Sequence, residues 1–238
     1  MTNDQYSVAV PFYDLWHEDG HVREIRELLP PLLHGVRGAV LEIGAGTGLI
    51  TELIARETRG EIFAVEPSPG MRSVLLSRLA ARPDLLARVT VLPQDALSVD
   101  LAEPVEVVVM IAVLNGFTPQ DRERLWPALA RRLRPGGLLL LNHRDRPMPV
   151  PGEPELMGSY RVGRHHYEIL GQVLEAGGER VTSRFRYRIR QGDHLISEDE
   201  VVTESHRVPA ARLEAELEAA GFVPDTAPDG MRAWRLAK

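Results

Sequence analysis

Cysteine is absent from this sequence of 238 residues, which excludes disulfides, thiolate metal sites and cysteine nucleophiles. Long apolar runs are absent too, since none approaches the roughly 18 residues that a membrane span needs. The N-terminus lacks the basic start and long apolar stretch of a secretory signal. These absences predict a cytoplasmic protein with no membrane partner.

An excess of positive charge is also absent. The chain has 28 Lys and Arg residues and 34 Asp and Glu residues, which gives a net charge of −6. A chain with this balance lacks the broad basic surface of a general nucleic-acid binder, so we expect no nucleic-acid partner. Its length suits one α/β domain with an elaboration, or two small domains.

Short apolar segments alternate with amphipathic ones between residues 40 and 143. The apolar segments are continuous rather than alternating in polarity, which is typical of a parallel sheet covered by helices on both faces. The expected strands cover residues 40–43, 61–66, 89–92, 105–112 and 138–141. The expected helices cover residues 47–57, 68–81 and 120–133.

Different patterns flank this core. Residues 21–33 form an amphipathic helical lead-in, and the four prolines within residues 144–158 predict a loop. Residues 160–208 predict three antiparallel strands, with turns at 176–179 and 191–193. A helix at 209–220 and a last strand at 232–236 complete the chain.

A glycine-rich loop follows the first strand, with Gly44, Gly46 and Gly48 at alternate positions. Glycines allow a tight turn and let the backbone approach a ligand closely. Leu49 stands where the dinucleotide fingerprint needs its third glycine, and the phosphate loop of nucleoside triphosphatases is absent. The loop therefore indicates a ligand site of another kind.

Two acidic residues follow the next two strands. Glu66 ends the second strand, where a carboxylate can accept both ribose hydroxyls of an adenosine ligand, and Asp95 follows the third, where it can accept the adenine amino group. The carboxyl ends of parallel strands share one edge of a sheet, so we expect the two acids and the glycine loop to form one site.

These strings resemble, in order, the motifs of the class I S-adenosylmethionine-dependent methyltransferases. They are Glu42-Ile-Gly-Ala-Gly-Thr-Gly48, Val65-Glu66-Pro-Ser, Gln94-Asp95-Ala96, Val108-Val-Met-Ile-Ala-Val-Leu-Asn115 and Leu133-Arg-Pro-Gly-Gly-Leu138. The resemblance implies an α/β fold, a Rossmann-like seven-stranded, mostly parallel sheet with helices on both faces and its last strand antiparallel. The predicted three-stranded antiparallel insertion adds to it.

The resemblance also implies S-adenosyl-L-methionine as the cofactor and assigns roles to residues. Gly44, Ala45 and Gly46 would pass close to its methionine part, whose ammonium would meet Glu42. Glu66 would hold the ribose. Contacts to the adenine and the rest of the cofactor would come from Met71, Asp95, Ala96 and Ile111.

The opening Tyr6-Ser-Val-Ala-Val-Pro-Phe-Tyr13-Asp is similar to that of small-molecule methyltransferases, including amino-sugar N-methyltransferases of antibiotic pathways, although its alanine falls one place early. That likeness implies that Tyr13 closes over the cofactor and Tyr6 contacts the acceptor. Ordinary aromatic packing of the lead-in is the alternative.

These patterns divide the chain into four parts. They are a helical N-terminal lid (1–35), a cofactor-binding core (36–143), a loop and acceptor-side insertion (144–208), and a helix and strand completing the core (209–238).

Histidines supply the candidates on the acceptor side. His143 ends the fifth strand, where it either acts as a base or makes a structural hydrogen bond. His165 and His166 point to opposite faces of a strand, so one of them is expected to line the pocket. Asn115 is a further substrate-contact candidate, His206 a weaker one, and His17 and His21 belong to the lid without an assigned role. We expect no metal site.

Five arginines share one face of a predicted strand, and the next strand carries three glutamates. The arginines are Arg180, Arg184, Arg186, Arg188 and Arg190, and the glutamates are Glu198, Glu200 and Glu204. Cross-strand ion pairs on a solvated face are the expected arrangement, with an anion site for the acceptor as the alternative.

The sequence thus predicts a methyltransferase that acts on a small-molecule acceptor in bacterial specialised metabolism. N-methylation is favoured narrowly over O-methylation, with carbon third. Two alternatives stay open: an enzyme that uses the cofactor for cyclisation or rearrangement, and a non-catalytic binding protein. The acceptor and the formation of a homodimer are also left open.

Overall fold

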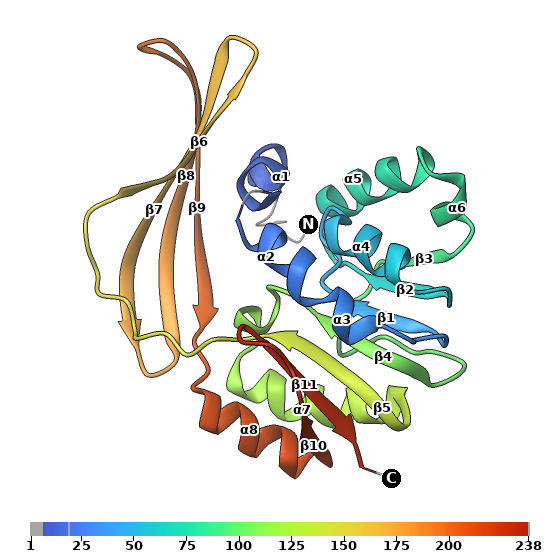
Figure 1. Ribbon diagram of the computed structural model, residues 1–238. Coiled ribbons are helices and arrows are strands. Elements are labelled where there is room, and N and C mark those ends of the chain that lie inside the picture. The colour runs from blue at the N-terminus through green and yellow to red at the C-terminus, as the bar shows by residue number, and fades with distance from the viewer. Residues whose placement is uncertain (1–6, 19, 238) are drawn as a thin grey trace.

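The computed structural model describes residues 7–18 and 20–237, and its larger sheet has seven strands in the order β10-β11-β5-β4-β1-β2-β3 (Figure 1). Their bounds are β1 Val40–Ile43, β2 Ile62–Val65, β3 Val89–Leu92, β4 Val105–Met110, β5 Leu133–Asn142, β10 Phe222–Asp225 and β11 Met231–Leu236. Strands β1 to β5 run parallel, and β11 is antiparallel to both β5 and β10. The predicted Rossmann-like fold class is confirmed.

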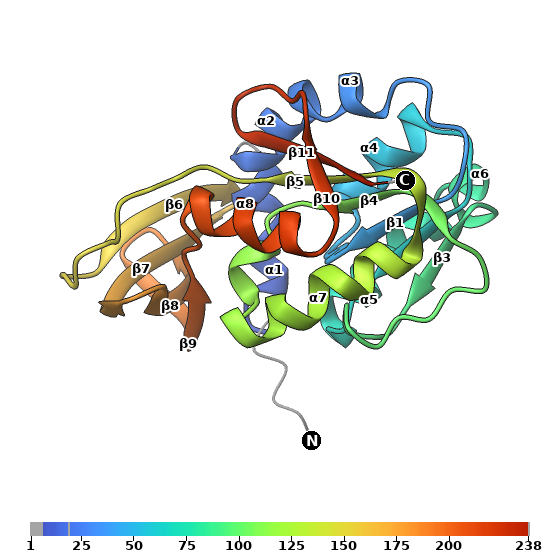
Figure 2. The same ribbon diagram turned by 90° about the horizontal axis from the view of Figure 1, so that it is seen from below.

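Helices cover both faces of this sheet. They are α1 Val10–Glu18, α2 His21–Leu28, α3 Pro30–Leu33, α4 Leu49–Glu57, α5 Pro69–Ala80, α6 Pro83–Leu86, α7 Pro119–Arg132 and α8 Ala210–Ala219, with a 3₁₀ turn η1 at Leu114–Gly116. Val40 of β1 packs in one core cluster with α2 to α5, and its neighbour Leu41 packs in the other with α7 and α8. Figure 2 shows α2 and α3 on the opposite side of the sheet from α7. Within the described ranges, no helix is both long and apolar enough to cross a membrane.

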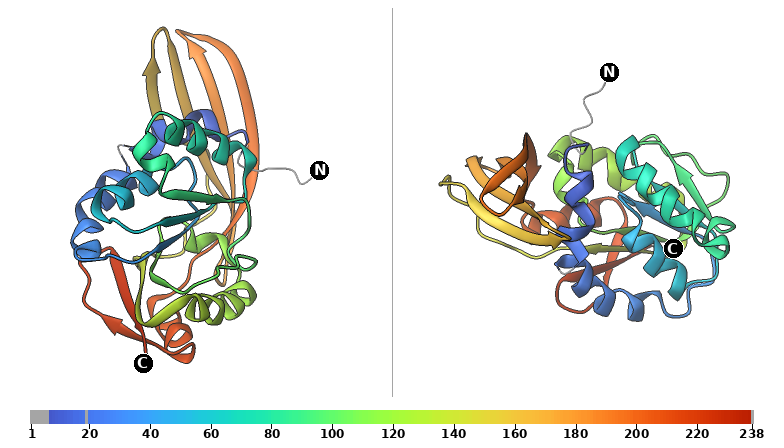
Figure 3. Two further views of the ribbon diagram at one scale, coloured as in Figure 1. Left: turned by 90° about the vertical axis from the view of Figure 1, so that its right-hand side faces the viewer. Right: turned by 90° about the horizontal axis from the view of Figure 1, so that it is seen from above.

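A second, four-stranded antiparallel sheet lies beside the core (Figure 1). Its strands are β6 Glu155–Val162, β7 His165–Gly177, β8 Arg180–Gln191 and β9 His194–His206, in this order. The hairpin ends that join β6 to β7 and β8 to β9 extend beyond the core (Figures 1 and 3). Helix α1 packs against this sheet, because the ring of Phe12 lies 5.2 Å from that of Tyr167 and 5.1 Å from that of Tyr187.

The second sheet has one more strand than the three expected. The three strands and two turns predicted after residue 160 are present, but β6 begins at Glu155, inside the segment predicted to be a loop. Gly163, with φ +60°, makes a tight turn between β6 and β7. Pairing with β7 imposes the strand on residues 155–158, despite the prolines that precede them.

Two further differences lie in the predicted helices and strands of the core. The lead-in helix divides into α2 and α3 at Pro30, because proline lacks an N–H and disfavours helix in the residue before it. Strand β10 was not expected from its own residues, since it is short and contains Pro224, which an edge strand tolerates.

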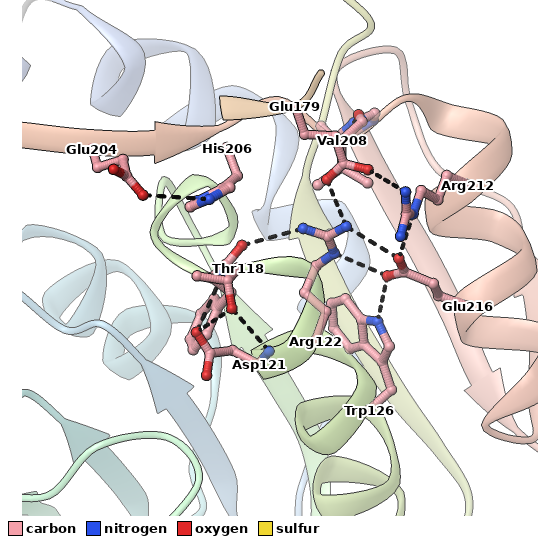
Figure 4. A network of polar contacts seen from close by, with 12 residues as sticks. Thr118, Asp121, Arg122, Trp126, Glu179, Glu204, His206, Val208, Arg212 and Glu216 are labelled. Carbon is pink, nitrogen blue, oxygen red and sulfur yellow. Dashed lines mark hydrogen bonds and ion pairs between the residues drawn. The ribbon is translucent and has the colours of Figure 1, made fainter. Parts of the chain in front are cut away.

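A buried arginine joins the second sheet to the helices of the core (Figure 4). Arg122 of α7 is fully buried and donates from Nη2 to Glu179, in the turn between β7 and β8, at 2.8 Å. It also donates from Nε to Glu216 of α8 at 2.9 Å, and the indole N–H of Trp126 donates to the same carboxylate at 3.0 Å. Arg212 pairs with both glutamates from the exposed side. This network attaches the lower end of the second sheet to the helices of the core.

Candidate functional site

The glycine loop between β1 and α4 takes a conformation that L-residues rarely adopt. Gly44, Gly46 and Gly48 have φ values of +76°, +57° and +91°. A Cβ on Gly48 would lie 2.5 Å from a methyl group of Leu75, so this position has no room for a side chain. The three atoms nearest to a Cβ on Gly46 would all belong to Tyr13, the first being its hydroxyl oxygen at 3.6 Å. The backbone at Gly46 is therefore open to a ligand beneath Tyr13.

Glu66, at the end of β2, is tied to this loop. The N–H of Gly46 donates to Oε2 of Glu66 at 2.8 Å, and the N–H of Ser68 donates to Oε1 at 2.8 Å. The carboxylate is buried and receives backbone donors at both oxygens. Its orientation is therefore fixed before any ligand arrives.

A second carboxylate, that of Glu42 in β1, lies beneath the loop. It is buried, and the hydroxyl of Thr51 donates to its Oε2 at 2.6 Å. Burial raises the pKa of Glu42 to about 7; the hydrogen bond from Thr51 opposes that shift and the nearby charge of Glu66 adds to it. Glu42 does not line either of the two cavities described below.

A cleft of about 420 Å³ opens over the glycine loop, at the carboxyl edge of the parallel strands. We call it the glycine-loop cleft. On the core side it is lined by Gly44, Gly46, Glu66, Met71, Ile111 and Asn115. On the opposite side it is lined by α1 with Tyr13, Trp16 and His17, and by β8 and β9 with Phe185, Tyr187, Val201 and Thr203. The second sheet thus covers the same edge that the glycine loop occupies.

Helix α1 is fastened to the loop by Asp14. The hydroxyl of Thr47 donates to Oδ1 of Asp14 at 2.5 Å, and Arg78 of α5 pairs with Oδ2 of the same carboxylate. This places the neighbouring Tyr13 over Gly46. Asp14 directly follows Tyr13 in the opening motif, and its sequence context alone predicts no role for it.

A second cavity of about 710 Å³ adjoins the cleft, and we call it the polar pocket. Its lining includes His21, Glu24, Ala112, Asn115, Asn142, His143, Arg144, Asp145, Arg146 and Arg207. Three of these residues, His21, Ala112 and Asn115, line both cavities. Ala112 has a left-handed φ of +55°, and its N–H donates to Oδ1 of Asn142 at 2.7 Å. Backbone strain of this kind is commonly found at functional sites.

Comparison with known proteins identifies the family. The family profile described as "Methyltransferase domain" matches residues 40–137. An uncharacterized methyltransferase of Mycobacterium tuberculosis is 36% identical over 171 residues, which make up 71% of this chain and 59% of that protein. The same figures hold for an uncharacterized methyltransferase of Mycobacterium bovis. This chain therefore spans less than two thirds of the length of these curated relatives.

The chain belongs to the class I S-adenosylmethionine-dependent methyltransferases. S-adenosylmethionine is accordingly its cofactor. The overall fold is shared with solved methyltransferase structures, although at low sequence identity. DesVI of Streptomyces venezuelae has a TM-score of 0.75 at 17% identity, with 96% of each chain covered.

Two further structures of this fold come from methyltransferases named for sugars. The amino pentose methyltransferase CalS10 of Micromonospora echinaspora, involved in calicheamicin biosynthesis, has a TM-score of 0.72 at 17% identity, covering 93% of this chain and 92% of that one. The sugar N-methyltransferase KedS8 of a Streptoalloteichus species has a TM-score of 0.69 at 20% identity, covering 95% and 93%.

The lining of the glycine-loop cleft fits the cofactor of this methyltransferase family. A fixed carboxylate, Glu66, suits two ribose hydroxyls, and the apolar side chains of Met71 and Ile111 suit an adenine ring. The backbone at Gly46, where a Cβ would face Tyr13, offers the close approach that the methionine part needs. The structure thus brings six of the ten predicted cofactor residues to one cleft: Tyr13, Gly44, Gly46, Glu66, Met71 and Ile111.

The other four lie outside the cleft lining. Glu42 lies beneath the loop, as described, and Ala45 is buried within it. Asp95 is exposed after β3, and its Oδ1 accepts from the N–H groups of Leu97 and Ser98, which closes a local turn. Burial alone would raise the pKa of Asp95, but the hydrogen bonds from Ser98 and Leu97 lower it. Ala96 is buried, and its carbonyl oxygen accepts from Arg132.

His143, the predicted base, lies at the end of β5 beside the polar pocket. Its Nε2 lies 2.8 Å from the carbonyl oxygen of Val208, so this nitrogen carries the proton and donates. Its Nδ1 is enclosed by the protein and has no hydrogen-bond partner among the described residues. Neither ring nitrogen is presented to the pocket, and the side chain connects β5 to the segment that enters α8.

The remaining acceptor candidates are widely separated. Asn115 lies where the two cavities meet. His165 and His166 begin β7 next to the turn at Gly163, and neither lines the cleft or the polar pocket. Tyr6 falls outside the described residues. His206 is buried, with Nε2 3.9 Å from a carboxylate oxygen of Glu204.

The arginine row of β8 forms the predicted cross-strand ion pairs. Arg186 lies opposite Glu200 and donates to it at 2.9 Å, and Arg188 lies opposite Glu198 and donates to it. Arg184 reaches Glu200 at 3.0 Å. These side chains face away from α1, whereas the intervening Phe185 and Tyr187 line the glycine-loop cleft. Arg180 pairs with Glu204 at 3.5 Å, whereas Arg190 donates to the carbonyl oxygen of Asp193. Four of the five arginines are therefore paired with glutamates on this face of the second sheet.

Proposed function

We propose that this methyltransferase transfers the methyl group of S-adenosylmethionine to a nitrogen atom of a small polar acceptor, in bacterial specialised metabolism. One observation carries the proposal: the glycine-loop cleft, to which we assign the cofactor, shares lining residues with a polar pocket at the carboxyl edge of the sheet. A donor in the first cavity and an acceptor in the second would meet where they share lining residues.

The cofactor-side residues act by holding and shielding. Glu66 accepts the ribose hydroxyls from a position that Gly46 and Ser68 fix, and Met71 packs against the adenine. Tyr13, placed by the bond between Asp14 and Thr47, covers the methionine part and excludes water. The bound cofactor supplies an activated methyl group on a sulfonium, so the protein contributes mainly alignment.

The polar pocket supports a small acceptor that carries hydroxyl, amine or acidic groups. Its lining includes the amides of Asn115 and Asn142 and the guanidinium groups of Arg146 and Arg207. Arg144 is already paired with Glu24 at 2.5 Å. Side chains of this kind bind sugars and other densely polar molecules by hydrogen bonds.

Nitrogen is favoured over oxygen because a neutral amine can attack before it loses a proton. A hydroxyl acceptor usually needs a base for its proton, whereas a neutral amine already carries its lone pair. Both nitrogens of His143 are either bonded or enclosed, so His143 does not prepare a hydroxyl for attack, whereas an amine needs a base only for the proton that it loses after attack. The shared fold of CalS10, an amino pentose methyltransferase, and KedS8, a sugar N-methyltransferase, supports the same choice.

The test is an acceptor screen with methyl-labelled S-adenosylmethionine, read by mass spectrometry. The panel pairs each amine with its hydroxyl counterpart, for example glucosamine with glucose, and other amino sugars with the corresponding sugars. We expect the labelled methyl on nitrogen of an amine, with an equal amount of S-adenosylhomocysteine. Label on oxygen would contradict the preference for nitrogen. A rearranged or cyclised product without label would instead favour a non-methylating enzyme.

A further inference from the structure

His21, the first residue of α2, lies at the boundary between the two cavities. The glycine-loop cleft and the polar pocket share His21, Ala112 and Asn115 in their linings. Of these three side chains, that of Ala112 is apolar and the amide of Asn115 is not basic at neutral pH. His21 is therefore the shared side chain that can take up a proton.

The ring of His21 is held by an aromatic stack that begins at the cofactor side. The ring centroids of Tyr13 and His17 lie 4.3 Å apart, and those of His17 and His21 lie 4.5 Å apart. Both pairs have edge-on geometry. Trp16 stacks on His17 at 4.8 Å. Because Tyr13 is placed over the glycine loop, the same stack places His21 relative to that loop.

The imidazole of His21 is in the state that a proton acceptor needs. Burial lowers its pKa below the ordinary value, with Glu24 acting in the opposite direction, so the ring is neutral near pH 7. Glu24 is itself paired with Arg144, and His17, the other titratable ring in contact, is also neutral because burial lowers its pKa to about 3, with a smaller contribution from His21. Within the part of the chain that the structure describes, no residue hydrogen-bonds to either ring nitrogen of His21.

We propose that His21 contacts the nucleophilic atom of the acceptor and receives its proton, an inference that rests on the methyl-transfer function proposed above. A neutral amine donates one N–H to the imidazole, which turns its lone pair toward the methyl group. The nitrogen forms its bond to the methyl carbon while the carbon–sulfur bond breaks, and the electron pair stays on sulfur, which becomes a neutral thioether. The proton of the resulting ammonium group passes to His21 and then to water.

The first test needs no turnover and uses diethyl pyrocarbonate, which acylates neutral imidazole. Saturating S-adenosylhomocysteine should slow the modification of His17, which lines only the glycine-loop cleft, and leave His21 reactive through the polar pocket. Peptide mass spectrometry separates the two residues. Equal protection of both histidines would overturn the placement of His21 beside the acceptor.

The second test uses variants and the amine that the wild-type protein methylates best in the acceptor screen. We expect His21→Gln to lower kcat by at least about tenfold with unchanged affinity for S-adenosylmethionine, since the variant can neither hold the lone pair toward the methyl group nor take up the proton. This loss is at or below the lower end of the 10²–10⁴-fold that general-base help is typically worth. Added imidazole should restore part of the activity of His21→Ala, which a merely structural histidine would not allow. The exposed His34, changed to Gln, is the matched control.

The results separate the two proposals. Loss of less than tenfold in His21→Gln, or no response of His21→Ala to imidazole, would overturn the role of His21 while leaving methyl transfer intact. If the wild-type protein methylates no amine in the panel, the proposed function fails, and the modification experiment still decides whether His21 faces the polar pocket.

Discussion

The backbone N–H of Gly46 donates to Oε2 of Glu66 at 2.8 Å and joins the glycine loop to the end of the neighbouring strand. One hydrogen bond thus connects the two motifs on which the cofactor assignment rests. Because Ser68 donates to the other carboxylate oxygen, Glu66 has a single defined orientation along the wall of the cleft. The loop and the acid therefore form one preorganised site.

Replacing Gly46 by alanine should weaken cofactor binding. Its φ of +57° strains any L-residue, and the added methyl group would occupy the space below Tyr13. We expect the Kd for S-adenosylmethionine, measured by calorimetry, to rise about tenfold, which corresponds to roughly 1.4 kcal/mol. Gly136→Ala is the control, since Gly136 has φ +74° with nothing within 4 Å of its Cβ position. Equal losses of affinity in both variants would mean that strain alone explains the result.

Glu42 should make the protein less stable as the pH rises. Burial holds its pKa at about 7 in the folded state, above the ordinary value of 4.5, so the folded protein binds the extra proton between these two pH values. The contribution of Glu42 to the free energy of unfolding is therefore largest below about pH 4.5, and about 3 kcal/mol of that contribution is lost by pH 7.

Glu42→Gln tests this directly, because the amide oxygen can still accept from Thr51. Urea unfolding at several pH values between 5 and 8 should show the variant gaining stability over the wild type as the pH rises. The exposed Glu57→Gln should follow the wild-type profile. A difference between Glu42→Gln and wild type that stays constant with pH would show that the carboxyl does not titrate in this range.

His143→Ala should affect stability more than catalysis. Its Nε2 donates to the carbonyl oxygen of Val208 in a buried setting, so its removal should cost about 1–3 kcal/mol of unfolding free energy. With an amine acceptor, kcat should fall less than about tenfold, because His143 does not take the proton. A fall of a hundredfold or more, at unchanged KM for the cofactor, would make His143 the base after all.

Arg122 and Arg212 provide a matched pair, since both contact the carboxylates of Glu179 and Glu216. Arg122 is fully buried, whereas the side chain of Arg212 is 51% exposed. Arg122→Met should destabilise the protein by about 3 kcal/mol or more, because it leaves buried charge poorly compensated. Arg212→Met should cost less than about 1 kcal/mol. Equal losses in chemical denaturation would contradict the view that Arg122 attaches the second sheet.

The main sheet and the convergence of residues on the glycine-loop cleft could be predicted because their signals are local and ordered along the chain. Continuous apolar strands, the glycines at 44, 46 and 48, and Glu66 at a strand end belong to neighbouring elements. Asp95 has the same kind of signal, but its carboxylate bonds to the N–H groups of the next turn, a competition that strand position does not reveal.

The acceptor side could be predicted less well, because it is formed by segments far apart in the sequence. His165 and His166 were placed on a strand correctly, but the turn at Gly163 puts them away from both cavities. His21 lines both cavities because α2 packs near the ends of β4 and β5, which its own residues do not indicate. Tertiary packing, rather than local pattern, decides which histidine lines both cavities.

We propose that Glu66 holds the cofactor in the glycine-loop cleft, and calorimetry with S-adenosylmethionine is the most direct test of this role. The measurement compares the wild-type protein with Glu66→Ala and with Glu57→Ala, an exposed glutamate on α4. Since a hydrogen bond to a charged group contributes about 1.5–3 kcal/mol, Glu66→Ala should bind at least about tenfold more weakly, and Glu57→Ala should match the wild type. Unchanged affinity in a folded Glu66→Ala variant would contradict the account.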